Sequence, residues 1–340
     1  MKAVRLHQFG GPEVLKYEDV PDPQPRQDQV LVRVRACALN HLDLWVCKGL
    51  PGVKLPHILG SDVAGEIVDV GGFVTGLQKG QRVILAPMVF CGHCRFCVSG
   101  VHNMCREFTV LGNGVDGGDC ELIAARHDCV IPIPDSLSFE EAAAVPLVGL
   151  TAWHMMVTRA QIRPDQNVLV LGANSGVGMA AIQIGKLFNA RVIATAGDEH
   201  KMQRARELGA DEVINHYTQK ISDEVKRITN KEMCDIVIEH VGQATWGESM
   251  KSLKPGGTIV TCGATTGPKV DLDLRFLFSK QFSFIGSYMG TMGDLHEVLK
   301  HVVGGKIKGV VDSTFPLSEA RAAHERMEKS QMFGKIVLKP

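Results

Sequence analysis

The sequence predicts an α/β protein with two domains, one β-rich and one built on a doubly wound parallel sheet. Three observations predict this class. The first 148 residues contain short alternating segments rich in valine and glycine, strands and helices alternate from residue 167 onward, and a glycine-rich turn follows the first of those strands. A chain of 340 residues is long enough for about two domains with their own cores.

Residues 1–148 have the pattern of a β-rich domain. Segments such as 29-QVLVRVRACAL-39 and 65-GEIVDVG-71 alternate apolar and polar side chains and lie between turn signals. This pattern predicts many short strands.

From residue 167 onward the pattern changes. The expected strands span 167–173, 191–196, 212–216, 235–242, 258–264 and 282–287, and the expected helices span 177–188, 199–208 and a segment before residue 255. Unbroken apolar strands separated by amphipathic helices are typical of a parallel sheet covered on both faces. This arrangement predicts a doubly wound nucleotide-binding domain.

The C-terminal stretch, residues 290–340, is too short to form a domain. It contains a helical segment at 293–305 and ends with a strand at 335–339 that no helix follows. We therefore expect residues 1–148 and 290–340 to form one domain, into which residues 149–289 are inserted.

Composition and charge argue against several classes of partner. Basic and acidic residues each number 37, so the formal net charge is zero and no overall field attracts nucleic acid or an anionic membrane. The N-terminus has no apolar segment of signal-peptide length, and no apolar run approaches the ~18 residues of a membrane span. We expect a soluble cytoplasmic protein that acts on a small molecule and binds neither nucleic acid nor membrane.

Four cysteines lie close together in 90-FCGHCRFCVSGVHNMC-105, with the spacing C-x2-C-x2-C-x7-C. They are Cys91, Cys94, Cys97 and Cys105. Four thiolates form the closed tetrahedral shell of a structural zinc, whereas a catalytic zinc keeps an open fourth position. The C-x2-C-x2-C-x3-C-P run of iron–sulfur proteins is absent, and free or disulfide-bonded cysteines are the weaker alternative. We predict one structural zinc per chain that orders this loop.

The turn after the first parallel strand reads 172-GANSGVG-178. Aligned with G-x-G-x-x-G so that Gly178 is last, Ala173 takes the first glycine position and Ser175 the second. Small residues let the backbone approach a pyrophosphate, and the following helix N-terminus favours its negative charge. The expected contacts are Ala173, Ser175, Gly176, Val177 and Gly178. The alternative is an ordinary glycine-rich turn.

The end of the second parallel strand bears on the choice of cofactor. NAD enzymes usually place an acid there for the ribose 2′-hydroxyl, whereas NADP enzymes need room and cations for a 2′-phosphate. The strand ends in Thr195, Ala196 and Gly197, so the acid is missing, and Lys201, Arg204 and His216 follow. We favour NADPH with contacts from Gly197, Lys201 and His216. NADH is possible, because Asp198 or Glu199 could reach the ribose and the basic residues could be solvated helix charges.

At this point the chain resembles the medium-chain dehydrogenase/reductase superfamily, which contains zinc alcohol dehydrogenases and zinc-free quinone oxidoreductases. The resemblance covers essentially the whole chain. It rests on 1-MKAVRL-6, 57-HILGSDVAGEIVDVG-71, the four-cysteine lobe, 140-EEAAAVPLVGLTAW-153, the nucleotide turn and 333-FGKIVL-338. It implies a GroES-like catalytic domain, a Rossmann domain and hydride transfer in a cleft between them.

The residues that hold the catalytic zinc of alcohol dehydrogenases are missing. At the positions of its two cysteines and its histidine the sequence has Asn40, Ser61 and Leu147, and Leu42 replaces the Ser or Thr of the proton relay. Without thiolate or imidazole at these positions, a metal cannot be held to polarise an alkoxide. The active site is similar instead to the quinone oxidoreductase and enoyl reductase branch.

Hydride transfer without zinc suits acceptors that conjugation already polarises, such as enones, quinones or acrylyl thioesters. The candidate catalytic residues are Asn40, Ser61, Asp62 and Tyr288. Asn40 is the favoured donor to the substrate, although it could merely cap the following turn. Asp43 could be a structural acceptor or a catalytic acid. The resemblance adds cofactor contacts at His41, Thr151, Gly263 and Ala264, and at Lys335 near the phosphates.

Two other functions stay open. One is an alcohol dehydrogenase with a remodelled metal site that uses Asp62, His41 or Asp43, and the other is a non-catalytic NADPH-binding protein. The resemblance also implies a homodimer or homotetramer, paired through the strand at 282–287.

Overall fold

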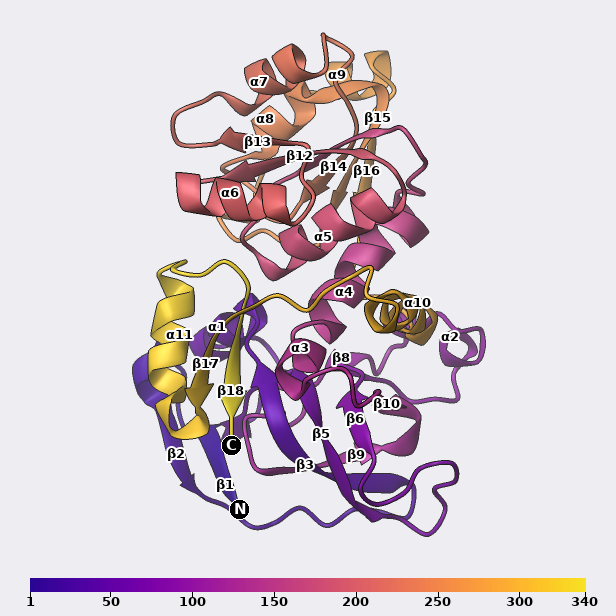
Figure 1. Ribbon diagram of the computed structural model, residues 1–340, viewed down its shortest axis with the longest axis vertical. Coiled ribbons are helices and arrows are strands. Elements are labelled where there is room, and N and C mark those ends of the chain that lie inside the picture. Colours follow the sequence, from indigo (N-terminus) through magenta and orange to yellow (C-terminus); the bar gives the residue numbers. More distant parts are fainter. The chain divides into compact units, whose positions relative to one another are not determined.

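The computed structural model describes residues 1–340, which form two compact units (Figure 1). Unit 1 comprises Met1–Leu147 and Lys308–Pro340, and unit 2 comprises Val148–Ile307. Each unit has its own hydrophobic core.

The boundary expected at residue 290 lies instead at residue 308, because helix α10 (Met292–Val303) packs within unit 2. The Asp294 carboxylate of α10 lies 2.8 Å from His154 Nδ1 and accepts a hydrogen bond of 2.6 Å from Thr158 Oγ1. This buried polar contact joins α10 to the helical segment that precedes the parallel sheet. The helix expected at 293–305 therefore belongs to the parallel-sheet unit.

Unit 2 is built on a parallel sheet of six strands in the order β13-β12-β11-β14-β15-β16. The strands are β11 (Asn167–Val170), β12 (Arg191–Ala196), β13 (Glu212–Asn215), β14 (Cys234–Glu239), β15 (Leu253–Thr261) and β16 (Ser283–Gly286). Leu169, Ile193 and Val237 lie side by side in register and are fully buried. Burial on both faces explains the unbroken apolar runs and confirms the predicted doubly wound sheet.

Helices cover both faces of this sheet (Figure 1). Those in contact with its strands are a π-helix (His154–Arg159), α5 (Gly176–Leu187), α6 (Glu199–Glu207), α7 (Ile221–Ile228) and α8 (Trp246–Lys251). The other helices are α4 (Pro146–Trp153), α9 (Leu274–Ser279) and α10. Gly185 of α5 approaches Val192, whereas Val225 of α7 packs in one cluster with Ile193. Consecutive strand residues point to opposite faces, so α5 and α7 lie on opposite sides.

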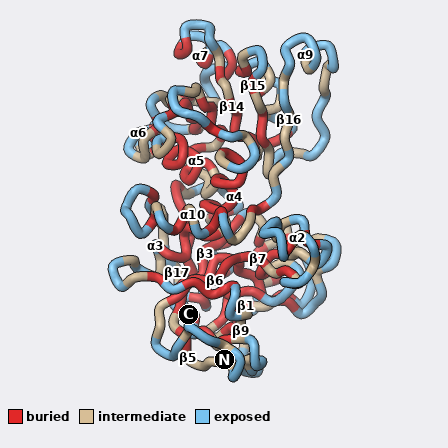
Figure 2. The backbone as a smooth tube through the Cα atoms, turned by 90° about the vertical axis from the view of Figure 1, so that its right-hand side faces the viewer, coloured by how far each residue is buried: buried red, intermediate tan, exposed pale blue.

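Unit 1 contains a seven-stranded, mainly antiparallel sheet in the order β10-β6-β5-β3-β18-β17, with β9 also paired to β3. Its strands are β3 (Gln29–Ala38), β5 (Asp62–Val70), β6 (Arg82–Leu85), β9 (Leu122–Arg126), β10 (Val130–Pro132), β17 (Val311–Pro316) and β18 (Lys335–Lys339). Smaller sheets contain β1 (Lys2–Leu6), β2 (Leu15–Asp19), β4 (His57–Ile58), β7 (Met88–Val89) and β8 (Thr109–Val110). Burial follows the strands, while the loops are exposed (Figure 2).

The helices of unit 1 are short. They are α1 (His41–Lys48), α2 (Arg95–Val98), α3 (Phe139–Ala143), α11 (Ala320–Glu328) and 3₁₀ turns at Pro12–Val14, His102–Met104, His127–Cys129 and Leu317–Glu319. The C-terminal strand β18 pairs with β3, which ends just before α1. This pairing brings the last residues of the chain next to the start of α1. Among the helices of both units, none has the length and apolar character needed to span a membrane.

Candidate functional site

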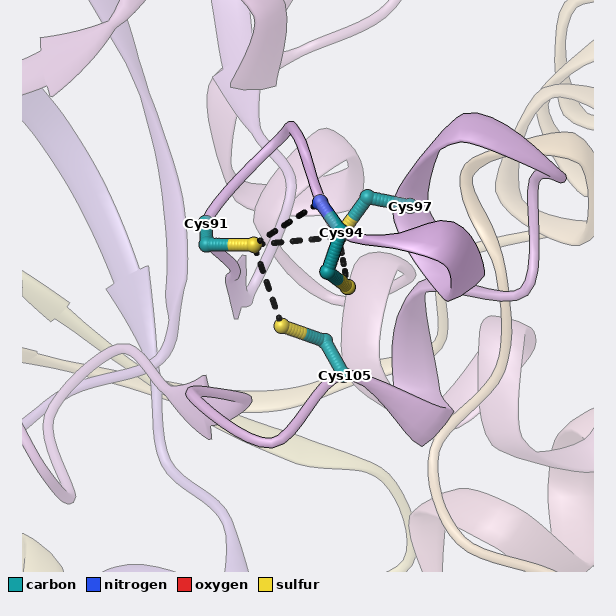
Figure 3. A group of neighbouring side chains, drawn as sticks. All are labelled: Cys91, Cys94, Cys97 and Cys105. Carbon is teal, nitrogen blue, oxygen red and sulfur yellow. Dashed lines mark hydrogen bonds between the residues drawn. The ribbon is translucent and has the colours of Figure 1, made fainter.

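The four cysteines of the lobe, which spans residues 88–108, converge on one point (Figure 3). The Sγ atom of Cys91 lies 3.8 Å from that of Cys97 and 3.6 Å from that of Cys105, and the Sγ atoms of Cys94 and Cys97 are 3.6 Å apart. All four thiols are free, and all four sulfur atoms lie within 4.8 Å of one another.

These separations fit a zinc ion. Four sulfur ligands about 2.3 Å from a central zinc stand about 3.8 Å apart along each edge of the tetrahedron. Backbone hydrogen bonds from His93 and Cys94 lower the pKa of Cys91 to about 6, which favours the thiolate that a metal binds. His93 and Glu107 form a second possible group with Cys91, but both are exposed. The four-cysteine shell is complete in itself, so this lobe fits a structural zinc.

The glycine-rich turn of unit 2 joins β11 to α5. Gly172 has a φ of +61° and donates its N–H to Thr195 Oγ1 at 3.0 Å. Ser175 caps α5, because its Oγ accepts a hydrogen bond of 2.9 Å from Gly178 N–H. A Cβ atom at Gly178 would lie 2.2 Å from the carbonyl oxygen of Gly172, so only glycine fits there.

The same turn contains the other expected contacts. Ala173 is fully buried and donates its N–H to the Thr195 carbonyl at 2.8 Å, while Gly176 and Val177 open α5 and are half-buried. The first amides of a helix have no partner within it, and the dipole there favours an anion. The turn lies where the strand order reverses between β12, β11 and β14, which is where nucleotides bind in such sheets. These residues fit the pyrophosphate of a dinucleotide.

A basic and aromatic cluster follows the ends of β12 and β13. Burial and then the positive charge of Lys201 lower the pKa of His216, whose ring lies 4.4 Å from that of Tyr217. A Cβ atom at Gly197 would lie 2.5 Å from the ring of Tyr217, which is 80% exposed. Asp198 accepts the N–H of Lys201 at 2.8 Å and lies 3.2 Å from its Nζ, so this acid caps α6 and pairs with Lys201.

Three further expected cofactor residues and Tyr288 also lie in unit 2. Thr151 of α4 is buried, and its Oγ1 has no hydrogen-bond partner. Gly263 and Ala264 follow β15 at the carboxyl edge of the sheet. Tyr288 is 55% exposed, and partial burial raises its pKa.

Unit 1 contains a buried cluster of Asn40, Asp62 and Lys335. Lys335 Nζ lies 2.9 Å from Asp62 Oδ2 and 2.5 Å from Asn40 Oδ1, and Asn40 Nδ2 donates to Asp62 Oδ2 at 3.0 Å. The other Asp62 oxygen accepts the N–H of Leu147 at 2.7 Å. Asp62 therefore joins the positions of Asn40 and Leu147, two of the three that hold zinc in alcohol dehydrogenases.

This geometry corrects two expectations. Asn40 was expected to donate to the substrate, but its amide hydrogens go to Asp62 and to the Ala38 carbonyl at 3.3 Å, and its oxygen accepts from Lys335. Lys335 was expected near the cofactor phosphates, but only 3% of it is exposed and its ammonium is in a buried ion pair. Both residues instead hold the Asp62 carboxylate within unit 1.

The remaining polar side chains of this region differ in whether they have hydrogen-bond partners. Ser61 is completely buried, and its Oγ has no hydrogen-bond partner. Asp43 accepts the N–H of Asn40 at 2.6 Å and that of Gly60 at 3.4 Å, and burial raises its pKa to about 6. His41 is exposed and lies edge-on against Trp45, with 5.2 Å between the rings. Ser61 is thus the candidate catalytic residue whose polar group the protein leaves unpaired.

Sequence reasoning missed several residues near these sites. Gly172 adopts the left-handed conformation one residue before the matched motif, and His240 at the end of β14 bonds to the turn. Asp119 is fully buried beside Cys37 in unit 1, and neither carboxylate oxygen has a partner in hydrogen-bond geometry. The signals were present as a glycine before the motif, a histidine directly after a buried strand and a carboxylate directly after two glycines.

Comparison with known protein families gives two matches that together cover most of the chain. The model described as "Alcohol dehydrogenase GroES-like domain" matches residues 26–135 of unit 1. The model described as "Zinc-binding dehydrogenase" matches residues 176–304 of unit 2.

Individual relatives align over the full length. A solved structure of an NAD-dependent alcohol dehydrogenase is 43% identical, with a TM-score of 0.97 and complete coverage of both chains. An alcohol dehydrogenase of Geobacillus stearothermophilus is 35% identical, covering 100% of this chain and 99% of the relative. An acryloyl-coenzyme A reductase of Metallosphaera sedula is 34% identical, with 99% of each chain covered. A quinone oxidoreductase of Mus musculus is 33% identical, covering 99% of this chain and 97% of the relative.

Proposed function

Because the chain belongs to the medium-chain dehydrogenase/reductase superfamily and is an oxidoreductase of that type, we propose that it reduces activated carbon–carbon double bonds or quinones with NADPH and without a catalytic zinc. The acceptor is an enone, a quinone or an acrylyl-type thioester. The observation that carries the proposal is the buried cluster at Asn40, Asp62 and Lys335, where zinc-dependent relatives need metal ligands.

The hydrogen bonds that Asp62 and Asp43 accept support chemistry without a catalytic metal. Asp62 accepts three hydrogen bonds, from Leu147, Asn40 and Lys335, and Asp43 accepts two from backbone amides. A metal at either carboxylate would have to replace these donors. The groups of three or more His, Cys, Asp or Glu side chains with suitable spacing both lie in the lobe. We therefore place the single zinc at the four cysteines, where it orders the loop.

The cluster around Lys201 supports NADPH. Gly197 has no side chain at the end of β12, where the rings of His216 and Tyr217 lie against it, and the charge of Lys201 acts on His216. The acids that would bond a ribose 2′-hydroxyl are engaged, Asp198 with Lys201 and Glu199 with Arg206 at 3.1 Å. The name of the 43% identical relative specifies NAD, so both cofactors belong in the test.

The proposed roles of the residues follow from their contacts. A bound nicotinamide supplies the hydride to the β-carbon of the acceptor. Ser61 donates its unpaired hydroxyl to the oxygen on which negative charge develops, because no protein group satisfies it. The Asp62 and Lys335 pair, held by Asn40, fixes the residue after Ser61, and Asp43 holds the backbone N–H of Gly60 before it. Thr151 and Tyr288 bind on the nicotinamide side.

The assembly and location are part of the same proposal. Strand β16 is the last strand of its sheet and α9 exposes Phe276 and Phe278, so we propose a homodimer or homotetramer paired at this edge. All ten cysteines are free thiols, which suits a cytoplasmic location.

The deciding experiment combines metal content with turnover. Zinc per chain is measured by elemental analysis, and oxidation of NADPH and NADH is followed with quinones, enones and an acrylyl thioester, before and after a chelator. One zinc and chelator-insensitive reduction with NADPH is the expected result. Two zincs and chelator-sensitive oxidation of alcohols would establish a remodelled metal site instead. Cofactor binding without turnover on any acceptor would indicate a non-catalytic binding protein.

A further inference from the structure

His240 connects the glycine-rich turn to the second half of the parallel sheet. It follows β14 directly, and its Nε2 lies 2.8 Å from the Leu171 carbonyl oxygen and 3.3 Å from Ser175 Oγ. A Cβ atom at Gly172 would lie 3.2 Å from His240 Cε1, so the imidazole packs against the turn itself. The ring is therefore held in the crevice between the ends of β11 and β14.

The hydrogen bonds define which nitrogen carries the proton. A carbonyl oxygen can only accept, so the bond to Leu171 requires a proton on Nε2. Burial lowers the pKa of His240, which keeps the ring neutral near pH 7. In the neutral ring Nδ1 then carries a lone pair and accepts a hydrogen bond. Both protein contacts use Nε2, and His240 is half-buried, so Nδ1 is left for a ligand.

We infer that His240 contacts the cofactor, with Nδ1 accepting a hydrogen bond from a hydroxyl of the nicotinamide-side ribose while Nε2 holds the glycine-rich turn. The inference rests on the nicotinamide cofactor of the proposed function, but neither on the NADPH preference nor on the acceptor.

Topology and chemistry together select this group of the cofactor. In a doubly wound sheet the first half binds one nucleotide and the second half the other, and β14 begins the second half, opposite the adenosine side at β12. A neutral lone pair repels phosphate oxygens and needs a donor. On the nicotinamide nucleotide the donors are the ribose hydroxyls and the carboxamide, and the carboxamide is expected at Gly263 and Ala264. The ribose hydroxyl is therefore the fitting partner.

The test distinguishes two roles of His240: the support of the glycine-rich turn by Nε2 and the contact of Nδ1 with the ribose. Glutamine at this position can still place an N–H near the Leu171 carbonyl but offers no acceptor where Nδ1 lies. Dissociation constants are measured by protein fluorescence for the dinucleotide that binds more tightly, for its adenosine half alone (2′,5′-ADP or ADP) and for the 3-acetylpyridine analogue, which lacks the carboxamide N–H. The exposed His296 of the same unit provides the matched control H296Q.

H240Q is expected to weaken the dinucleotide and its acetylpyridine analogue by roughly 2- to 10-fold, the effect of one neutral hydrogen bond. It leaves the adenosine half unchanged, while H240A weakens all three ligands because the turn loses its support. An unchanged dinucleotide affinity in H240Q, or an equal loss for the adenosine half, would overturn the inference. A loss that vanishes with the acetylpyridine analogue would assign Nδ1 to the carboxamide and overturn the ribose contact. A wild-type protein that binds neither dinucleotide would refute the proposed function itself.

Discussion

Replacing Asp119 by asparagine is expected to change how the stability of the protein depends on pH. Asp119 is completely buried, and neither carboxylate oxygen meets a donor in hydrogen-bond geometry. Burial, and after it the charge of Asp43, raises the pKa of Asp119 from 3.8 to about 8, and the neighbouring Cys37 thiol offsets this only in part. The folded protein therefore keeps a proton that the unfolded chain releases above pH 4 or so.

The sign and size of the effect follow from proton linkage. A raised carboxyl pKa means that the folded state binds more protons, so stability falls as pH rises from about 4 to about 8 and is level above that. At about 1.4 kcal/mol per pKa unit, the loss across this window is at most roughly 6 kcal/mol. Asparagine has nearly the same shape and does not titrate, so D119N lacks this loss.

Urea unfolding of zinc-loaded protein at pH 5.5, 7 and 9 measures the effect as the difference between variant and wild type. At each pH we compare the free energy of unfolding of D119N with that of the wild type. We expect this difference to rise by several kcal/mol in favour of D119N from pH 5.5 to pH 9. Asp116 provides the control. Burial alone would raise its pKa, but hydrogen bonds from His57 and a backbone amide lower it overall. The stability of D116N relative to the wild type should therefore not rise between pH 5.5 and pH 9. A difference for D119N that stays within about 0.5 kcal/mol across this range would refute the argument, because it would mean that Asp119 is ionised in the folded protein.

Three shorter predictions concern the other sites. Removing the Lys201 charge in K201A should raise KM for NADPH by about 10-fold or more and change KM for NADH less than about 2-fold; equal effects would contradict a 2′-phosphate contact. S61A should lower kcat by about 100-fold with an unchanged Kd for the cofactor, and an unchanged kcat would remove Ser61 from the chemistry. Replacing one zinc ligand in C97S should lower both zinc content and thermal midpoint while cofactor binding persists; full zinc content by elemental analysis would show that the lobe is not the metal site.

The centre of the parallel sheet could be predicted in detail because β11 and β12 are apolar runs that are buried on both faces. The expected strand at 191–196 agrees with β12 residue for residue, since burial on both faces leaves little ambiguity about where it ends. The grouping of the four thiols was equally clear, because the four cysteines are close in sequence. Helix α10 was assigned to the other domain because a single helix shows an apolar face but not the partner that the face packs against.

The polar cluster of unit 1 could be named but not arranged from the sequence. Asn40, Asp62 and Lys335 were each singled out, yet they come from segments up to 295 residues apart, and only the pairing of β5 and β18 with β3 brings them together. Sequence reasoning therefore assigned Asn40 to the substrate and Lys335 to the phosphates. Once they are adjacent, their donors and acceptors satisfy one another, which leaves Ser61 as the unpaired hydroxyl.

The ion pair between Asp62 and Lys335 allows a direct test of whether these buried groups stabilise one another. Only 3% of the Lys335 side chain and none of the Asp62 side chain is exposed. Replacing lysine alone in K335M leaves a buried carboxylate without its counter-charge and should cost about 3–5 kcal/mol. The double variant D62N/K335M removes both charges, while the amide oxygen at residue 62 still accepts from Leu147 and its NH2 group replaces the oxygen that accepted from Asn40.

We therefore expect the double variant to lose less stability in urea unfolding than the sum of D62N and K335M, with a coupling of about 1–3 kcal/mol. The exposed pair of Lys300 and Glu297, 2.6 Å apart, is the matched control and should couple by less than about 1 kcal/mol. A coupling near zero for Asp62 and Lys335 would mean that water or another group compensates each charge separately. The carboxylate would then be available to a metal, and the case for chemistry without a catalytic zinc would lose its main support.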